Sequence, residues 1–169
     1  MGNKEQATNL FSKLIDIVER LRSPDGCPWD KKQTHESLLP YFLEETYEVI
    51  ESVESNDWKT LKEELGDVLL HILLQAQIAK ESNKFDILDT LNGINKKLIK
   101  RHPHVFGNEN RENISEVKKD WELRKHIEKR RESRLDGVPK TLPSLTRAQR
   151  LQEKASLVGF DWDKIEPIW

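Results

Sequence analysis

Helical spacing of apolar residues is the feature that most constrains the fold of this sequence. Apolar side chains recur three and four positions apart over long segments, and the alternating β-branched runs typical of strands are absent. The seven glycines and seven prolines fall mostly between these segments. We therefore predict an all-α fold, with helices over about residues 4–21, 34–55, 58–82, 86–101, 115–134 and 144–159.

Several of the expected helix ends carry local signals. Asp57 is a typical N-cap residue, and Asp86 and Asp89 have the spacing of a capping pair. Pro40 is compatible only with the first turns of its helix, and Gly159 is typical of a helix C-terminus. We expect one helical domain over residues 1–136, followed by a linker-like helical segment over residues 137–169.

Composition limits the classes of partner. The 34% of charged residues nearly cancel to a formal net charge of -2, so no general attraction to nucleic acid or anionic membrane is expected. A single cysteine, Cys27, excludes an internal disulfide and suits a reducing compartment. The N-terminus lacks the apolar core of a signal peptide, and the longest apolar stretch, at residues 68–79, is too short to span a bilayer. We expect a cytoplasmic protein.

Two acidic segments, EETYE at residues 44–48 and EELGD at residues 63–67, share the pattern acid-acid-x-x-acid. At about 100° per residue, the second acid of each lies about 60° from the apolar stripe of its helix, the third about 120° and the first about 160°. Both expected helices therefore carry the same acidic arc on the same flank. The second and third acids of the two segments are Glu45, Glu48, Glu64 and Asp67.

A break as short as residues 55–57 makes the two acidic helices antiparallel neighbours. Packing their apolar stripes together would bring these four carboxylates toward one point, where they repel each other and lose hydration unless a cation binds. Oxygen-only ligands favour a hard ion, Mg²⁺ or Mn²⁺, and Mg²⁺ is usually shared with substrate phosphates. The alternative is that the glutamates are good helix formers on a solvated face. Gly66 supports the site, because a glycine inside a helix costs about 1 kcal/mol and indicates close approach beside the acids.

Two pairs of residues are candidates for holding a triphosphate. Lys97 and Arg101 share a helix face, and Trp121 and Lys125 have the same spacing, so that an indole could stack a base while the ammonium meets a phosphate. Each pair also has a structural interpretation, as cations in a last helical turn and as a tryptophan anchored in a core. His71 is interpreted as a core histidine.

Four blocks in order, CPWD (residues 27–30), LEETYEV (43–49), EELGDVL (63–69) and KRHPHVFG (100–107), resemble the MazG family of all-α nucleoside triphosphate pyrophosphohydrolases. The resemblance extends over about residues 10–162. It implies a four-helix core with additional C-terminal helices, usually dimeric, and magnesium bound by the acidic segments. The implied metal ligands are Glu45, Glu48, Glu64 and Asp67, and the implied phosphate- and nucleotide-binding residues are Lys97, Arg101, Trp121 and Lys125.

The resulting hypothesis is Mg²⁺-dependent hydrolysis of a nucleoside triphosphate to the monophosphate and pyrophosphate, by a metal-activated water that attacks the α-phosphorus. Glu44 or Glu63, on the outer edges of the arcs, would orient that water or support the ligands, and Lys97 and Arg101 would act in catalysis as well as in binding.

Three other classes of protein compete with this hypothesis. Residues 142–162 resemble the segment that joins two MazG domains, so the chain resembles a first domain with its linker. It could then be a non-catalytic or weakly active nucleotide- or metal-binding regulatory domain of a larger two-domain protein. A structural helical adaptor is a further alternative. A ferritin-like di-iron site is disfavoured, because neither acidic segment has the Glu-x-x-His pattern.

Overall fold

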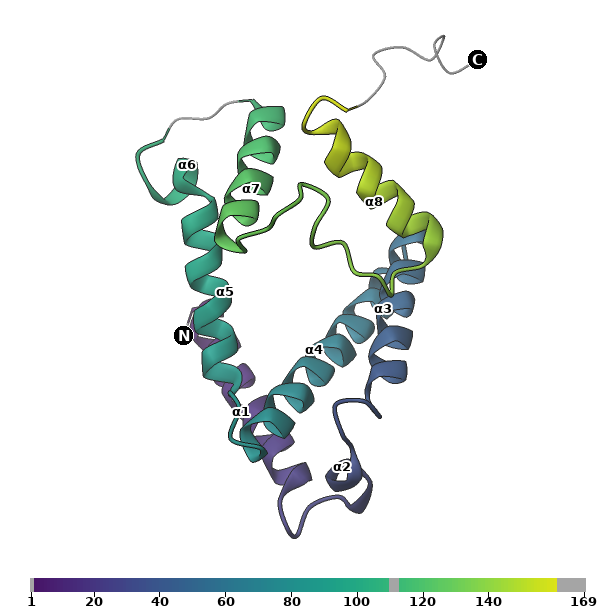
Figure 1. Ribbon diagram of the computed structural model, residues 1–169. Coiled ribbons are helices and arrows are strands. Elements are labelled where there is room, and N and C mark those ends of the chain that lie inside the picture. Colours follow the sequence, from purple (N-terminus) through teal and green to yellow (C-terminus); the bar gives the residue numbers. More distant parts are fainter. Residues whose placement is uncertain (1, 110–112, 161–169) are drawn as a thin grey trace. The chain divides into compact units, whose positions relative to one another are not determined.

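The computed structural model describes residues 2–109 and 113–160, and every regular element in these ranges is a helix (Figure 1). The all-α prediction is confirmed. The helices are α1 (Asn3–Arg22), α2 (Pro28–Lys32), α3 (Leu39–Glu54), α4 (Trp58–Glu81), α5 (Ile87–Arg101), α6 (Pro103–Phe106), α7 (Ile114–Glu128) and α8 (Ser144–Ser156). None of the helices in the described ranges is long and apolar enough to cross a membrane.

The chain divides into two compact units, residues 1–94 and residues 95–169, and α5 begins in the first and ends in the second. The expected division into residues 1–136 and 137–169 stays a prediction, and residues 161–169 of its second part lie outside the described residues.

The predicted helix ends are mostly present. The Asp57 carboxylate accepts hydrogen bonds from the backbone N–H groups of Lys59 (3.0 Å) and Thr60 (3.1 Å), so it caps α4 as expected. Asp86 and Asp89 accept reciprocally from each other's backbone N–H before α5.

The structure differs from the predicted helices at several places, including the short helix α6, which lies where no helix is expected. Residues 34–38 form turns instead of helix, because the Thr34 and Ser37 side chains bond each other's backbone N–H and compete with helical bonding. Pro40 therefore falls in the first turn of α3. Residues 28–32, expected as loop, form the short helix α2 with Pro28 in its first turn. Helix α7 ends at Glu128, just before Arg130 takes a positive φ of 49°.

The core of the first unit lies between α1 and the second half of α4. Five side chains form its buried centre: Val18, Leu38, Leu73, Leu74 and Ile78. Arg22 closes one end of this interface, with a side chain that is only 5% exposed. Its guanidinium donates to both carboxylate oxygens of Glu81 (2.9 and 2.8 Å) and to the carbonyls of Asp30 and Gln33, which ties α1 to α4 and to the α2 segment.

Helices α3 and α4 run side by side as an antiparallel hairpin (Figure 1). The apolar stripe expected to bury α3 is only partly covered: Phe42 and Val49 are half-buried. Four other members of that stripe are between 44% and 57% exposed: Leu39, Leu43, Ile50 and Val53. On α4, Leu65 (52%) and Ile72 (39%) are also exposed, because the buried residues of this helix lie chiefly on the side that packs against α1.

Candidate functional site

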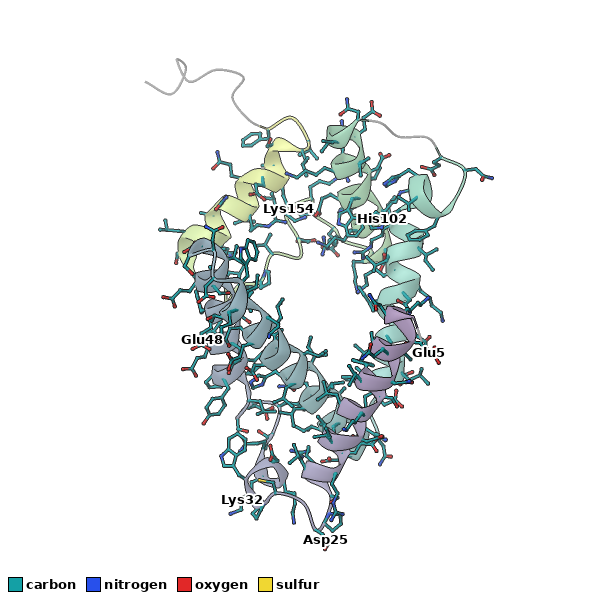
Figure 2. The ribbon with its side chains drawn as sticks, turned by 180° about the vertical axis from the view of Figure 1, so that it is seen from behind. Glu5, Asp25, Lys32, Glu48, His102 and Lys154 are labelled. Carbon is teal, nitrogen blue, oxygen red and sulfur yellow. The ribbon has the colours of Figure 1, made fainter. Side chains whose placement is uncertain are left out.

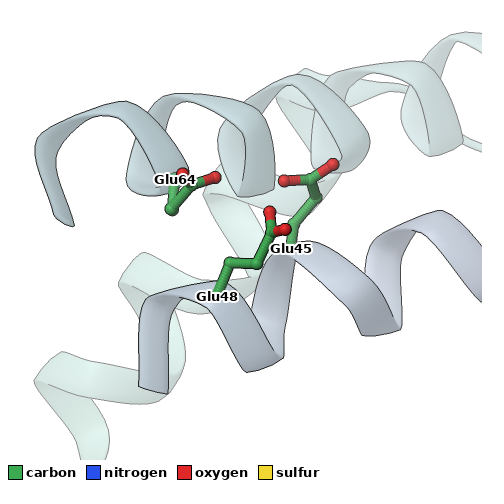
Figure 3. A group of neighbouring side chains, drawn as sticks. All are labelled: Glu45, Glu48 and Glu64. Atoms are coloured by element: carbon green, nitrogen blue, oxygen red, sulfur yellow. The ribbon is translucent and has the colours of Figure 1, made fainter. Parts of the chain in front are cut away.

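Three carboxylates converge between α3 and α4. Glu45 and Glu48 extend from α3 toward Glu64 on α4 (Figure 3), and one oxygen from each lies within 4.8 Å of the other two. The tight turn at residues 55–57 makes this possible, because it places the acidic flanks of the two helices opposite each other. Three of the four residues predicted as metal ligands are thus in one cluster.

The fourth predicted ligand, Asp67, interacts electrostatically with Glu45 and Glu64 of this cluster. Burial raises the pKa of Glu45 to about 7, with further contributions from the charges of Asp67 and Glu48. Burial likewise raises the pKa of Glu64, followed by the charges of Glu48 and Asp67. The carboxylates therefore repel one another at neutral pH, and a bound cation would relieve this repulsion.

The donor set fits a hard divalent cation. All donors are carboxylate oxygens, half-buried at Glu45, Glu64 and Asp67 and exposed at Glu48. Glu44 and Glu63, predicted to orient water, are both exposed and lie outside the three-carboxylate cluster.

Two residues beside the acids have informative environments. A Cβ at Gly66 would meet nothing within 4 Å among the described atoms, so packing inside the chain does not require this glycine. His71 is only 7% exposed, with its ring 5.8 Å from that of Phe42, as a core histidine should be. Burial lowers its pKa, and the neighbouring charge of Asp67 opposes that shift.

The predicted phosphate- and nucleotide-binding residues lie in the second unit. The Arg101 side chain is 5% exposed, donates to Glu128 at 3.0 Å and lies 5.2 Å from the ring centre of Trp121. The ring of His102 lies 4.7 Å from that of Trp121. Arg101 and Trp121 therefore form one cluster.

The other two predicted binding residues lie near this pair along their helices. Lys97 is half-buried one turn before Arg101, and Lys125 one turn after Trp121 with its ammonium 3.6 Å from Glu122. Glu122 and Glu128 are not among the residues predicted from the sequence. Glu122 was detectable from its three-residue spacing to Lys125, whereas Glu128 pairs with a residue on another helix and left no local signal.

Trp29 on α2 is not buried. It is 52% exposed, and its ring meets that of Tyr41 edge-on at 6.1 Å, which joins α2 to the first turn of α3.

Comparison with known proteins gives consistent results. The family model of the MazG nucleotide pyrophosphohydrolase domain matches residues 33–106. The chain is 47% identical over 98% of its length to a "nucleoside triphosphate pyrophosphohydrolase/pyrophosphatase MazG" of Thermotoga maritima, of which it covers 64%. It is 44% identical over 95% of its length to a "nucleoside triphosphate pyrophosphohydrolase" of Escherichia coli K12, of which it covers 62%.

A solved structure also matches. The crystal structure of a MazG-related protein from Thermotoga maritima aligns with a TM-score of 0.57 at 36% identity, over 68% of this chain and 97% of that one. The chain thus spans nearly the whole of this short relative, but less than two thirds of the two longer ones.

Proposed function

This chain belongs to the MazG family, and from that membership we propose that it hydrolyses nucleoside triphosphates to the monophosphate and pyrophosphate in a Mg²⁺-dependent reaction. Water is added across the bond between the α- and β-phosphates, so that the nucleotide keeps one phosphate and the other two leave as pyrophosphate. The proposal extends to this chain what the names of its longer relatives state of them.

The carboxylate cluster of α3 and α4 is the observation that carries the proposal. Three carboxylates within 4.8 Å, with a Glu45 pKa raised to about 7, form a site in which negative charge is stabilised only by a cation or a proton. Glu45, Glu48, Glu64 and Asp67 would hold Mg²⁺. When bound, Mg²⁺ would supply positive charge to neutralise the phosphoryl oxygens.

The remaining roles follow from side-chain chemistry. Glu44 or Glu63, each exposed and next in sequence to a proposed ligand, would accept a proton from the attacking water or orient it. In the second unit, Lys97, Arg101 and Lys125 would bind phosphate oxygens, and the face of Trp121 would stack on the base. We propose a cytoplasmic location, which suits a nucleotide substrate and a single cysteine that excludes an internal disulfide.

We further propose that a second copy of the chain covers the exposed apolar side of the α3–α4 hairpin. Leu43 and Ile50, seven positions apart on α3, are 57% and 44% exposed, and Leu65 on α4 is 52% exposed. Exposed apolar patches of this kind mark interaction surfaces. Family resemblance favours a homodimer. Sedimentation equilibrium tests this proposal. The wild type should sediment as a dimer and the Ile50→Glu variant as a monomer, because a charge at Ile50 would oppose burial of this face.

A pyrophosphate-release screen over natural and modified triphosphates, with Mg²⁺ or with chelator, tests the activity. Turnover is expected only with Mg²⁺. Glu48→Ala and Asp67→Ala should each reduce turnover at least a hundredfold while the far-ultraviolet circular dichroism stays unchanged. Glu54→Ala is the matched control, since it removes an exposed glutamate from the last turn of α3 away from the cluster.

The outcomes separate the main alternatives. Turnover that persists in Asp67→Ala removes this residue from the site. Mg²⁺-dependent binding of nucleotide without any pyrophosphate release would instead identify a regulatory binding domain. A chain that shows no thermal shift with Mg²⁺ and nucleotide would be a structural helical protein.

A further inference from the structure

Glu122 on α7 lies between two lysine ammonium groups that come from different helices. The Nζ of Lys154, on α8, donates to one carboxylate oxygen at 3.1 Å (Figure 2 labels this residue). The Nζ of Lys125, on α7 itself, lies 3.6 Å from the other oxygen. Lys154 also donates to the backbone carbonyl of Arg134 at 3.2 Å, so its position is fixed from two sides.

The two lysines differ in their access to solvent. The side chain of Lys154 is 7% exposed, whereas that of Lys125 is 28% exposed. The buried ammonium of Lys154, with two acceptors, is not available to a bound nucleotide, whereas the side chain of Lys125 keeps contact with solvent. Glu122 and Lys154 line a cavity of only about 100 Å³, which is smaller than a nucleotide requires, so this pair is not itself a substrate site.

Glu122 is ionised at neutral pH. Burial of its carboxyl raises the pKa, but the hydrogen bond from Lys154 and the charges of Lys125 and Lys154 lower it further than burial raises it. The single negative charge of Glu122 is therefore shared by two positive charges. Whichever ammonium holds the carboxylate more tightly leaves the other freer to bind another anion.

We propose that Lys154 is a positioning residue for nucleotide binding: by neutralising Glu122 from the buried side, it leaves Lys125 free to bind a nucleotide phosphate. This inference rests on the proposed function, in which Lys125 contacts the substrate. It makes α8, which the sequence suggested was linker, a part of the nucleotide-binding unit.

The sign of the effect follows from the geometry. Without the Lys154 ammonium, the Glu122 carboxylate draws Lys125 into a closer pair, so phosphate must compete with a carboxylate for the same ammonium. Removing the charge of Glu122 as well would release Lys125 again. A purely structural role of Lys154 predicts instead that Glu122→Gln alone also weakens binding, because that change leaves the buried ammonium of Lys154 without its carboxylate partner.

The experiment compares Lys154→Met, Glu122→Gln and the double variant in the full chain. Dissociation constants are measured for a triphosphate with a methylene bridge between its α- and β-phosphorus atoms, in Mg²⁺, and KM and kcat are measured for the hydrolysable substrate. Lys154→Met should raise Kd and KM about tenfold with kcat changed less than twofold, and Glu122→Gln, Lys154→Met should return Kd and KM to within twofold of wild type. Arg150→Met is the matched control, because it breaks an ion pair with Glu153 on the same helix and leaves Glu122 untouched.

Glu122→Gln alone gives a result that does not depend on the folding of Lys154→Met. It should bind the analogue at least as tightly as wild type, and weaker binding by a folded Glu122→Gln variant overturns the inference. A wild-type chain that binds the analogue while Lys154→Met binds it equally well also overturns the inference and leaves the proposed function standing. A wild-type chain that neither binds nor cleaves any triphosphate overturns both.

Discussion

Replacing Glu45 with Gln should stabilise the metal-free protein at alkaline pH and abolish its stabilisation by Mg²⁺. The pKa of Glu45 is raised from 4.5 to about 7 in the folded chain, first by burial and then by the charges of Asp67 and Glu48. At pH values between these two pKa values, the Glu45 carboxyl is ionised in the unfolded chain and protonated in the folded chain. The contribution of Glu45 to stability therefore falls as the pH rises from about 4.5 to about 7.

The size of the effect can be worked from the same shift. At 1.36 kcal/mol per pKa unit, the full shift corresponds to about 3 kcal/mol as an upper bound. Because water still reaches these half-buried carboxylates, screening reduces this, and we expect Glu45→Gln to raise the free energy of unfolding by about 1 to 2 kcal/mol at pH 8 and by nearly zero at pH 4.5.

The assay is urea denaturation in chelator at the two pH values, repeated at pH 8 with excess Mg²⁺. Wild type should regain about 2.7 kcal/mol at a Mg²⁺ concentration a hundredfold above its Kd, while Glu45→Gln regains little. Glu44→Gln, an exposed neighbour on the same helix, is the control and should match wild type in chelator. A Glu45→Gln variant that is less stable than wild type at pH 8, or equally shifted at both pH values, would refute the reasoning.

Three further changes have expected outcomes. Gly66→Ala should raise the free energy of unfolding by about 0.5 to 1 kcal/mol, since the added methyl meets open space. A lower melting temperature would contradict this stabilisation. A parallel loss of nucleotide affinity would show that the glycine gives room to a ligand. Arg22→Met should lower the free energy of unfolding by about 2 to 4 kcal/mol, because it leaves two carbonyls and Glu81 without their donor. A change below about 0.5 kcal/mol in urea denaturation would show that these bonds contribute little. Trp121→Leu should raise KM about tenfold in the pyrophosphate assay through loss of base stacking worth about 1 to 3 kcal/mol, and an unchanged KM would remove Trp121 from the site.

The fold was largely predictable, because helical periodicity and capping residues act locally. Asp57 and Asp86 cap helices where their types and spacing indicated. The errors arose where local hydrogen bonds compete with the helix, as at Ser37, or where one residue takes a positive φ, as at Arg130. Burial was less predictable: the stripe containing Ile50 is apolar in sequence, but the described part of the chain does not cover it.

The candidate site divides in the same way. The carboxylate cluster was predictable because Glu45 and Glu64 lie on two helices joined by a three-residue break, so geometry on each helix was sufficient to place them together. The bonds of Arg101 to Glu128 and of Lys154 to Glu122 were not predictable from the sequence. Each bond joins two helices, and the sequence pattern does not specify the path of the chain between them.

The α3–α4 hairpin has a consequence for synthesis of the protein. All four proposed ligands lie within residues 45–67, and the core partner α1 precedes them in the chain. A nascent polypeptide leaving the ribosome therefore carries all four proposed ligands once α4 has emerged, before α5 to α8 have left the ribosome. Binding of the proposed Mg²⁺ would then favour pairing of these two helices during translation, so that the ion would assist folding of the protein before it assists any reaction.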